Sequence, residues 1–192
     1  MKTVFDINIW VNFALYMRSF APSDYNRAIR SKDLWNNNSV SVVHAALEGK
    51  YGTLAAHSHI WNTVEYVLVN EEPKLDPGFA KHLVKLCKEV VKLTNGEPVS
   101  DCNLVRKDID DFRWKNFLTD HEDATVAYGA LAINATHIVT HDWEFSMCEV
   151  PGISIWYQDN LTAEQRRRVE REKAERNRHK PKVLPYRPIN SK

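Results

Sequence analysis

The sequence lacks the features that define several large classes of protein. Its 192 residues contain no run of about 18 apolar residues, the length that a membrane-spanning helix needs. The first ten residues, MKTVFDINIW, have no long apolar stretch and include an aspartate at position 6, so we expect no secretory signal peptide. These absences predict a cytoplasmic protein that does not insert into a membrane.

Cysteine is also scarce. The three cysteines, Cys87, Cys102 and Cys148, are far apart and form no CxxC pair or Cys/His ligand pattern. Neither a disulfide framework nor a zinc ribbon is therefore indicated. Reduced thiols in an intracellular protein are the simplest interpretation.

The chain has no net excess of one charge, because 26 Lys and Arg balance 25 Asp and Glu. This balance excludes a uniformly basic nucleic-acid-binding protein. The two signs are nevertheless segregated. Residues 164–192 contain eleven basic against four acidic side chains, and residues 1–163 contain fifteen against twenty-one. An acidic body is thus followed by a basic segment.

Short apolar segments alternate with helical patterns along most of the chain. We expect strands over residues 2–5, 53–56, 137–140 and 153–156, and helices over 7–18, 24–34, 39–48, 58–69, 79–93 and 121–134. Strands that alternate with helices favour a mainly parallel central sheet covered on both faces, a three-layer α/β/α sandwich. Residues 97–119 have no clear pattern.

The charge pattern divides the chain into two parts. Residues 1–160 are expected to form the α/β domain. Residues 161–192 are expected to form a charged helix over 161–178 and an extended tail with three prolines. The arginines Arg166, Arg167 and Arg168 are candidates for contacts with RNA phosphates. The alternatives are a solvated helix with internal ion pairs and a surface that docks on another chain.

Four acidic residues lie in positions that suit a metal site. Asp6 and Asp142 each follow a predicted strand, Glu65 has apolar neighbours on its helix, and Asp123 opens an alanine-rich helix. Ligand sites of parallel sheets lie at the carboxyl ends of the strands. Converging carboxylates without cations repel one another, and Mg²⁺ or Mn²⁺ would relieve that repulsion. Taken singly, each acid also fits a structural role in a helix cap or a turn.

Three segments resemble the PIN-domain ribonucleases, the family that includes the toxins of VapBC toxin–antitoxin pairs. They are FDINIWV, TLAAHSHIWNTVEYVL and DHEDATVAYGALAINATHIVTHDWEF, and the resemblance covers roughly residues 1–157. It implies a PIN-like fold whose catalytic, metal-binding acids are Asp6, Glu65, Asp123 and Asp142. It also implies secondary roles for Asn8, Asp120, Thr140 and Glu144.

The resemblance implies a metal-dependent endoribonuclease that hydrolyses RNA phosphodiester bonds with Mg²⁺ or Mn²⁺ as cofactor. Its expected partners are RNA, an antitoxin protein and a second copy of the chain. Trp143, in the loop after Asp142, is a candidate for stacking on an RNA base. Departures from the family pattern include Ile7, which stands where many members have a small hydroxyl residue.

Two other functions stay open on the sequence. The first is a PIN-fold module that binds RNA or protein without cleaving it. The second is a His-Asp metal phosphohydrolase, suggested by His121-Glu122-Asp123 and His141-Asp142. The second alternative requires a mostly helical fold with histidine ligands on helices, whereas His141 follows a predicted strand.

Overall fold

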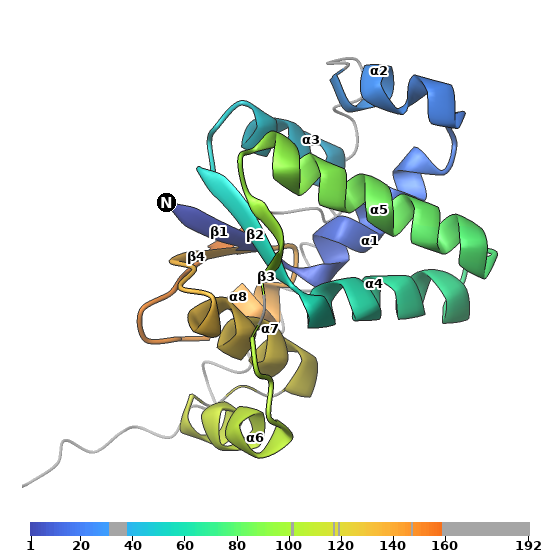
Figure 1. Cartoon of the computed structure of the whole chain (residues 1–192). Helices are drawn as coiled ribbons and strands as arrows, with labels where there is room; N and C mark the ends of the chain where they lie inside the picture. Colours follow the sequence, from blue (N-terminus) through green and yellow to red (C-terminus); the bar gives the residue numbers. More distant parts are fainter. Residues whose placement is uncertain (31–37, 101, 117, 119, 147, 159–192) are drawn as a thin grey trace, which may run out of the picture. The chain divides into compact units, whose positions relative to one another are not determined.

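A parallel sheet forms the centre of the protein. In the described residues, five strands lie in the order β3-β2-β1-β4-β5, and each neighbouring pair is parallel (Figure 1). The strands are β1 Lys2–Phe5, β2 Thr53–His57, β3 Glu97–Ser100, β4 His137–Thr140 and β5 Ser154–Tyr157. This topology confirms the predicted α/β class and the central parallel sheet.

The computed structural model describes residues 1–30, 38–100, 102–116, 118, 120–146 and 148–158. These residues all belong to one unit, Met1–Asp159. The predicted C-terminal extension, with its charged helix and its tail, lies outside the described residues. Among the described residues, no helix combines the length and the apolar character needed to cross a lipid bilayer.

Helices flank the sheet. They are α1 Ile7–Met17, the 3₁₀ helix η1 Pro22–Asp24, α2 Tyr25–Arg30, α3 Asn38–Leu47, α4 Ser58–Asn70, α5 Pro77–Leu93, α6 Arg106–Lys115, α7 His121–Ala132 and α8 Trp143–Ser146. Helices α3, α4 and α5 pack around α1, and α5 also contacts β2 and β3. Helix α7 contacts β2, β4 and α4 and carries α6 against it (Figure 1). The chain therefore forms the layered arrangement that the alternating pattern predicts.

Three of the helices begin at an aspartate. Asp6, Asp76 and Asp120 each accept a hydrogen bond from a backbone N–H in the first turn of α1, α5 and α7, respectively. Such bonds satisfy amide groups that have no partner within the helix. Asp6 and Asp120 thus each cap a helix, and this structural role is compatible with a further role in chemistry.

An aromatic cluster holds α1 and α4 against the sheet. The ring centroids of Phe5 and Trp10 are 5.4 Å apart, and those of Trp10 and Trp61 are 5.2 Å apart. All three side chains are almost fully buried. Burying an aromatic side chain stabilises a fold by roughly 2–3 kcal/mol, so this cluster fixes the start of α1 relative to the end of β1 and the start of α4.

The segment without a clear sequence pattern contains two elements that were not predicted, β3 and α6. Strand β3 has the sequence EPVS, which is short and contains a proline, and it lies at the edge of the sheet. Proline is tolerated at such an edge because one N–H group can face away from the ladder. Helix α6 is mostly charged, and Ile109 is the one buried residue among its described side chains, so the sequence contains no apolar stripe to indicate it.

Candidate functional site

The carboxyl ends of β1 and β4 bring two of the predicted acids to one edge of the sheet. Asp6 follows β1 directly, and Asp142 comes two residues after β4. The two strands are hydrogen-bonded neighbours, and the Asp6 backbone N–H donates to the Val139 carbonyl at 2.9 Å. Asp123 lies in the first turn of α7.

A buried threonine joins the two strand ends. The Thr140 hydroxyl donates to Oδ2 of Asp6 at 2.6 Å and accepts from the backbone N–H of Asp142 at 2.8 Å. Thr140 is 0% exposed, so the bond is shielded from water and strengthened. Thr140 therefore fixes the orientation of the Asp6 carboxylate relative to the loop that carries Asp142.

Burial makes the Asp6 carboxyl difficult to ionise. Desolvation raises its pKa from 3.8 to about 6, although hydrogen bonds from Thr140 and from the Ile7 backbone N–H act in the opposite direction. The negative charges of Asp142 and Glu122 contribute to the same rise of the pKa. A carboxylate that is both desolvated and surrounded by like charges favours either a proton or a cation.

The same effect is larger at Asp123. Burial is again the main cause, and with the charges of Asp6, Asp142, Asp120 and Glu122 it raises the pKa of Asp123 to about 8. We call these five residues the acidic cluster. The pKa shifts show that the negative charges of the cluster lie close enough to act on one another. Strongly raised carboxyl pKa values of this kind are concentrated at functional sites.

Glu122 is the member of the acidic cluster that was not among the predicted site residues. Its Oε1 atom lies 2.6 Å from Nε2 of His59 and accepts a hydrogen bond from the Thr63 hydroxyl at 3.2 Å. Burial raises the pKa of Glu122, but the His59 and Thr63 contacts outweigh burial and bring it below its ordinary value. Glu122 therefore stays ionised and is held in position by α4.

Glu65 was predicted to be the fourth acid, because its neighbours in the sequence are apolar. The structure places it half-buried on α4, two residues beyond Thr63. Residues two apart lie on different faces of a helix, and it is Thr63 that contacts Glu122 on α7. Glu122 is among the charges that raise the pKa values of Asp6 and Asp123, and the role predicted for Glu65 stays a prediction.

The other predicted residues have varied positions. Asp120 caps α7, and Asn8 is half-buried in the first turn of α1. The side chain of Glu144 lies outside the described residues, as do Arg166, Arg167 and Arg168. Trp143 is 9% exposed, so little of its indole is open to an RNA base, whereas Trp114 on α6 is 71% exposed.

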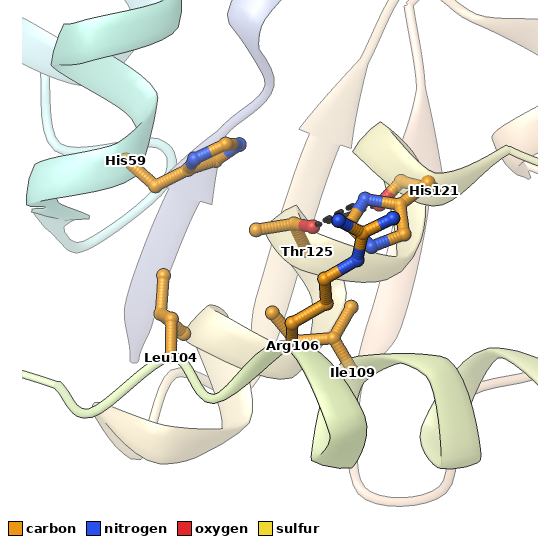
Figure 2. A pocket seen from close by; sticks show the side chains of 6 residues that line it. All are labelled: His59, Leu104, Arg106, Ile109, His121 and Thr125. Atoms are coloured by element: carbon orange, nitrogen blue, oxygen red, sulfur yellow. Dashed lines mark hydrogen bonds between the residues drawn. The ribbon is translucent and has the colours of Figure 1, made fainter.

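A pocket of about 410 Å³ adjoins the acidic cluster. It is lined by His59, Leu104, Arg106, Ile109, His121 and Thr125 (Figure 2). His59 connects the two features, because it lines the pocket and also contacts Glu122. Three of the lining residues come from the segment before α6 and from α6, where sequence reasoning found no candidates, and His59 on α4 was not among the predicted site residues. The sequence offers one indication of a binding surface there, because Arg106 directly follows the apolar residues Leu104 and Val105.

A second histidine, His57, lies between β2 and α7 and packs against Gly129. His57 ends β2 and is 0% exposed, and burial lowers its pKa to about 4, so the ring is neutral at physiological pH. A Cβ atom at Gly129 would lie 2.4 Å from Nε2 of His57. Glycine at this position allows α7 to lie directly on the ring, and this close packing brings Asp123 to the sheet edge.

The acidic cluster fits a divalent metal by its donor type and charge. Among the described residues, no three His, Cys, Asp or Glu side chains stand close enough together to form a ready metal-binding group. Mg²⁺, however, commonly takes one or two protein carboxylates and keeps several waters. Burial, and after it the neighbouring carboxylates, raises the pKa values of Asp6 and Asp123, and a bound cation would favour their ionised forms.

Comparisons with known proteins add no assignment. No protein-family model matches the sequence, and no curated protein matches it.

Proposed function

We propose that this protein is a metal-dependent endoribonuclease of the PIN type, which hydrolyses RNA phosphodiester bonds with Mg²⁺ or Mn²⁺. The observation that supports this most directly is the acidic cluster at the carboxyl edge of the parallel sheet, where the pKa of Asp6 is about 6 and that of Asp123 about 8. Carboxylates that repel one another in this way form an oxygen-rich site for a hard cation. The sequence resemblance to PIN-domain ribonucleases supports the same function.

The acids and the residues that contact them have different roles in this proposal. One or two of the carboxylates of Asp6, Asp123 and Asp142 would contact the ion directly and the others through bound water, and Thr140 holds the Asp6 carboxylate in place through its 2.6 Å hydrogen bond. A bound divalent ion would lower the pKa of a water molecule and neutralise charge on the phosphate. Glu122, oriented by His59 and Thr63, takes the place proposed from sequence for Glu65 and is positioned to hold a water molecule or accept its proton.

The biological role that accompanies this activity is the toxin of a toxin–antitoxin pair in the cytoplasm. An antitoxin protein and a second copy of the chain are the proposed partners. Residues 161–192 are the proposed segment for RNA phosphate contacts or antitoxin docking, because basic residues outnumber acidic ones there. The scarce and widely spaced cysteines of the sequence suit a reducing compartment.

A second function to test is a PIN-fold module that binds RNA without cleaving it. It is favoured by the lack, within the described residues, of three side chains already grouped for a metal ion. A His-Asp phosphohydrolase is disfavoured by the surroundings of His141. Its Nε2 atom lies 2.8 Å from the Ser39 hydroxyl, its Nδ1 atom lies 2.5 Å from the Gln158 carbonyl, and the residue is 5% exposed.

The decisive experiment is cleavage of total cellular RNA by the purified protein, with Mg²⁺ or Mn²⁺ and with EDTA. Asp6→Asn and Asp142→Asn test the acidic cluster, and Asp24→Asn is the matched control, because Asp24 is an exposed acid on η1. We expect discrete fragments with 5′-phosphate ends for the wild type and the control. Equal behaviour of the wild type and both cluster variants would leave the binding module as the better proposal.

A further inference from the structure

We propose that the pocket beside the acidic cluster is a subsite for one nucleotide of single-stranded RNA, in which Arg106 binds a phosphate and Leu104 and Ile109 contact the base or ribose. This inference rests on the proposed function, because it assigns part of the same substrate to a separate set of residues. Its volume of about 410 Å³ lies within the roughly 300–1,000 Å³ range of small-molecule pockets.

The chemistry of the pocket walls suits a nucleotide. Leu104 and the buried Ile109 offer an apolar surface, whereas Arg106 and the imidazoles of His59 and His121 offer planar groups with hydrogen-bond donors. RNA-binding proteins bind unstacked bases against planar or apolar side chains and bind phosphates with arginine. Figure 2 shows the Arg106 side chain extending from α6 toward His121, with His59 on the α4 side of the pocket.

Arg106 is free enough to exchange its present partner for a phosphate. Its side chain is 88% exposed, and its Nε atom lies 4.0 Å from Oδ2 of Asp110. A surface ion pair at such a distance stabilises a protein by no more than about 1 kcal/mol. A guanidinium–phosphate pair is stronger, because it forms two charge-assisted hydrogen bonds in a planar geometry.

The position of the pocket explains why a cation is needed there. The ionised carboxylates of the acidic cluster repel an approaching RNA phosphate, and Glu122, whose lowered pKa keeps it ionised, contacts the pocket residue His59. A permanent positive charge on the pocket rim would offset this repulsion for the neighbouring phosphate. The pocket thus places one nucleotide next to the acids and directs the following phosphate toward them.

The test measures RNA binding separately from cleavage. The probe is a fluorescein-labelled 12-nucleotide single-stranded RNA of random sequence, and binding to the Asp6→Asn protein is followed by anisotropy over a range of salt concentrations. Arg106→Gln is compared with Lys107→Gln, which removes the neighbouring exposed charge outside the pocket. Leu104→Asn is compared with Val105→Asn, which changes an exposed residue that does not line the pocket.

We expect Arg106→Gln to weaken binding about tenfold and to reduce the dependence of log K on log salt by about 0.7, the contribution of one phosphate contact on a single strand. Leu104→Asn should weaken binding without a change in that slope, because it removes an apolar contact. Both control variants should bind as the parent does. In the otherwise wild-type protein, Arg106→Gln should raise KM for RNA cleavage and leave kcat nearly unchanged.

Each other outcome has a distinct meaning. Equal losses for Arg106→Gln and Lys107→Gln, or no RNA binding by any variant, would overturn the subsite even if the wild type cleaves RNA with Mn²⁺. Selective loss of binding in Arg106→Gln, together with no cleavage by the wild type, would support the subsite and overturn the nuclease. Thermal unfolding of Arg106→Gln checks the fold, which should be unaffected because the side chain is almost fully exposed.

Discussion

Replacing Asp6 with asparagine removes the least exposed charge of the acidic cluster, so the effect on stability depends on pH. Burial raises the pKa of Asp6 from 3.8 to about 6, and the residue is 4% exposed. Each pKa unit corresponds to about 1.4 kcal/mol, so the ionised carboxylate costs the folded state about 3 kcal/mol. Asparagine has a single carbonyl oxygen, so it can accept from Thr140 or from the Ile7 backbone N–H but not from both. The loss of one hydrogen bond does not depend on pH, and the pH dependence of the difference therefore isolates the effect of burial.

The sign of the effect depends on which state binds the proton more tightly. The pKa of Asp6 is higher in the folded protein than in the unfolded chain, so protonation stabilises the fold at low pH. That stability is fully present below about pH 4 and is lost as the pH rises through about 6. The wild type should therefore lose about 3 kcal/mol relative to Asp6→Asn between about pH 4 and pH 8. Asp123 adds to this difference, because the charge of Asp6 helps to raise its pKa.

Urea unfolding in EDTA, followed by tryptophan fluorescence, measures this difference at several pH values. Asp24→Asn is the control, because it removes an exposed acid from outside the acidic cluster. A difference between wild type and Asp6→Asn that stays constant from pH 4 to 8, within about 0.5 kcal/mol, refutes the reasoning about burial. Added Mg²⁺ or Mn²⁺ at pH 8 should stabilise the wild type more than Asp6→Asn, because an ion that binds the folded state raises its stability.

Three further predictions follow from the same region. Thr140→Val should raise the pKa of Asp6 further and lower the free energy of unfolding by about 1–2 kcal/mol, because it removes the hydroxyl between Asp6 and the Asp142 backbone N–H. Carboxyl NMR titration measures the pKa, and urea unfolding measures the stability. Thr140→Ser is the control and should retain the wild-type values. Asp142→Asn should lower the pKa of Asp6 in the same titration, since it removes a nearby negative charge; an unchanged value would mean that the two groups do not interact. Gly129→Ala should destabilise the fold by about 1–3 kcal/mol, because its Cβ atom would meet the buried ring of His57, and the penalty should be smaller when measured in a His57→Ala background.

The order of the elements could be read from local patterns. Apolar strand segments and helical periodicity alternate along the chain, and most predicted boundaries lie within two residues of the observed ones. Two segments of the described part of the domain were exceptions. Residues 97–119 were not assigned, since EPVS and RKDIDDFRWK lack the apolar spacing that marks a strand or a helix. Their structure depends on neighbours: β3 pairs with β2, and α6 packs on α7. Trp143 was predicted to lie in a loop, and this was wrong, because it begins the one-turn helix α8, which is too short to show helical periodicity.

The acids that directly follow strands were predictable for a simple reason. Parallel strands end at one edge of a sheet, so Asp6 and Asp142 must lie near each other once β1 and β4 are neighbours. Glu122 and Glu65 show the limit of this reasoning. Both lie on helices, and which helix face meets another helix is decided by packing between segments about 60 residues apart, as in the contact of His59 with Glu122.

The sequence by itself therefore determined the parallel α/β architecture and the position of two acids at strand ends, because those depend on local periodicity and on the common direction of parallel strands. The tertiary structure alone decided which acids lie close enough to change one another's pKa values. It also decided that Arg106, His59 and His121 line one pocket. The physical reason is that burial, charge interactions and cavities arise between elements distant in the chain, and a linear pattern carries no information about those distances.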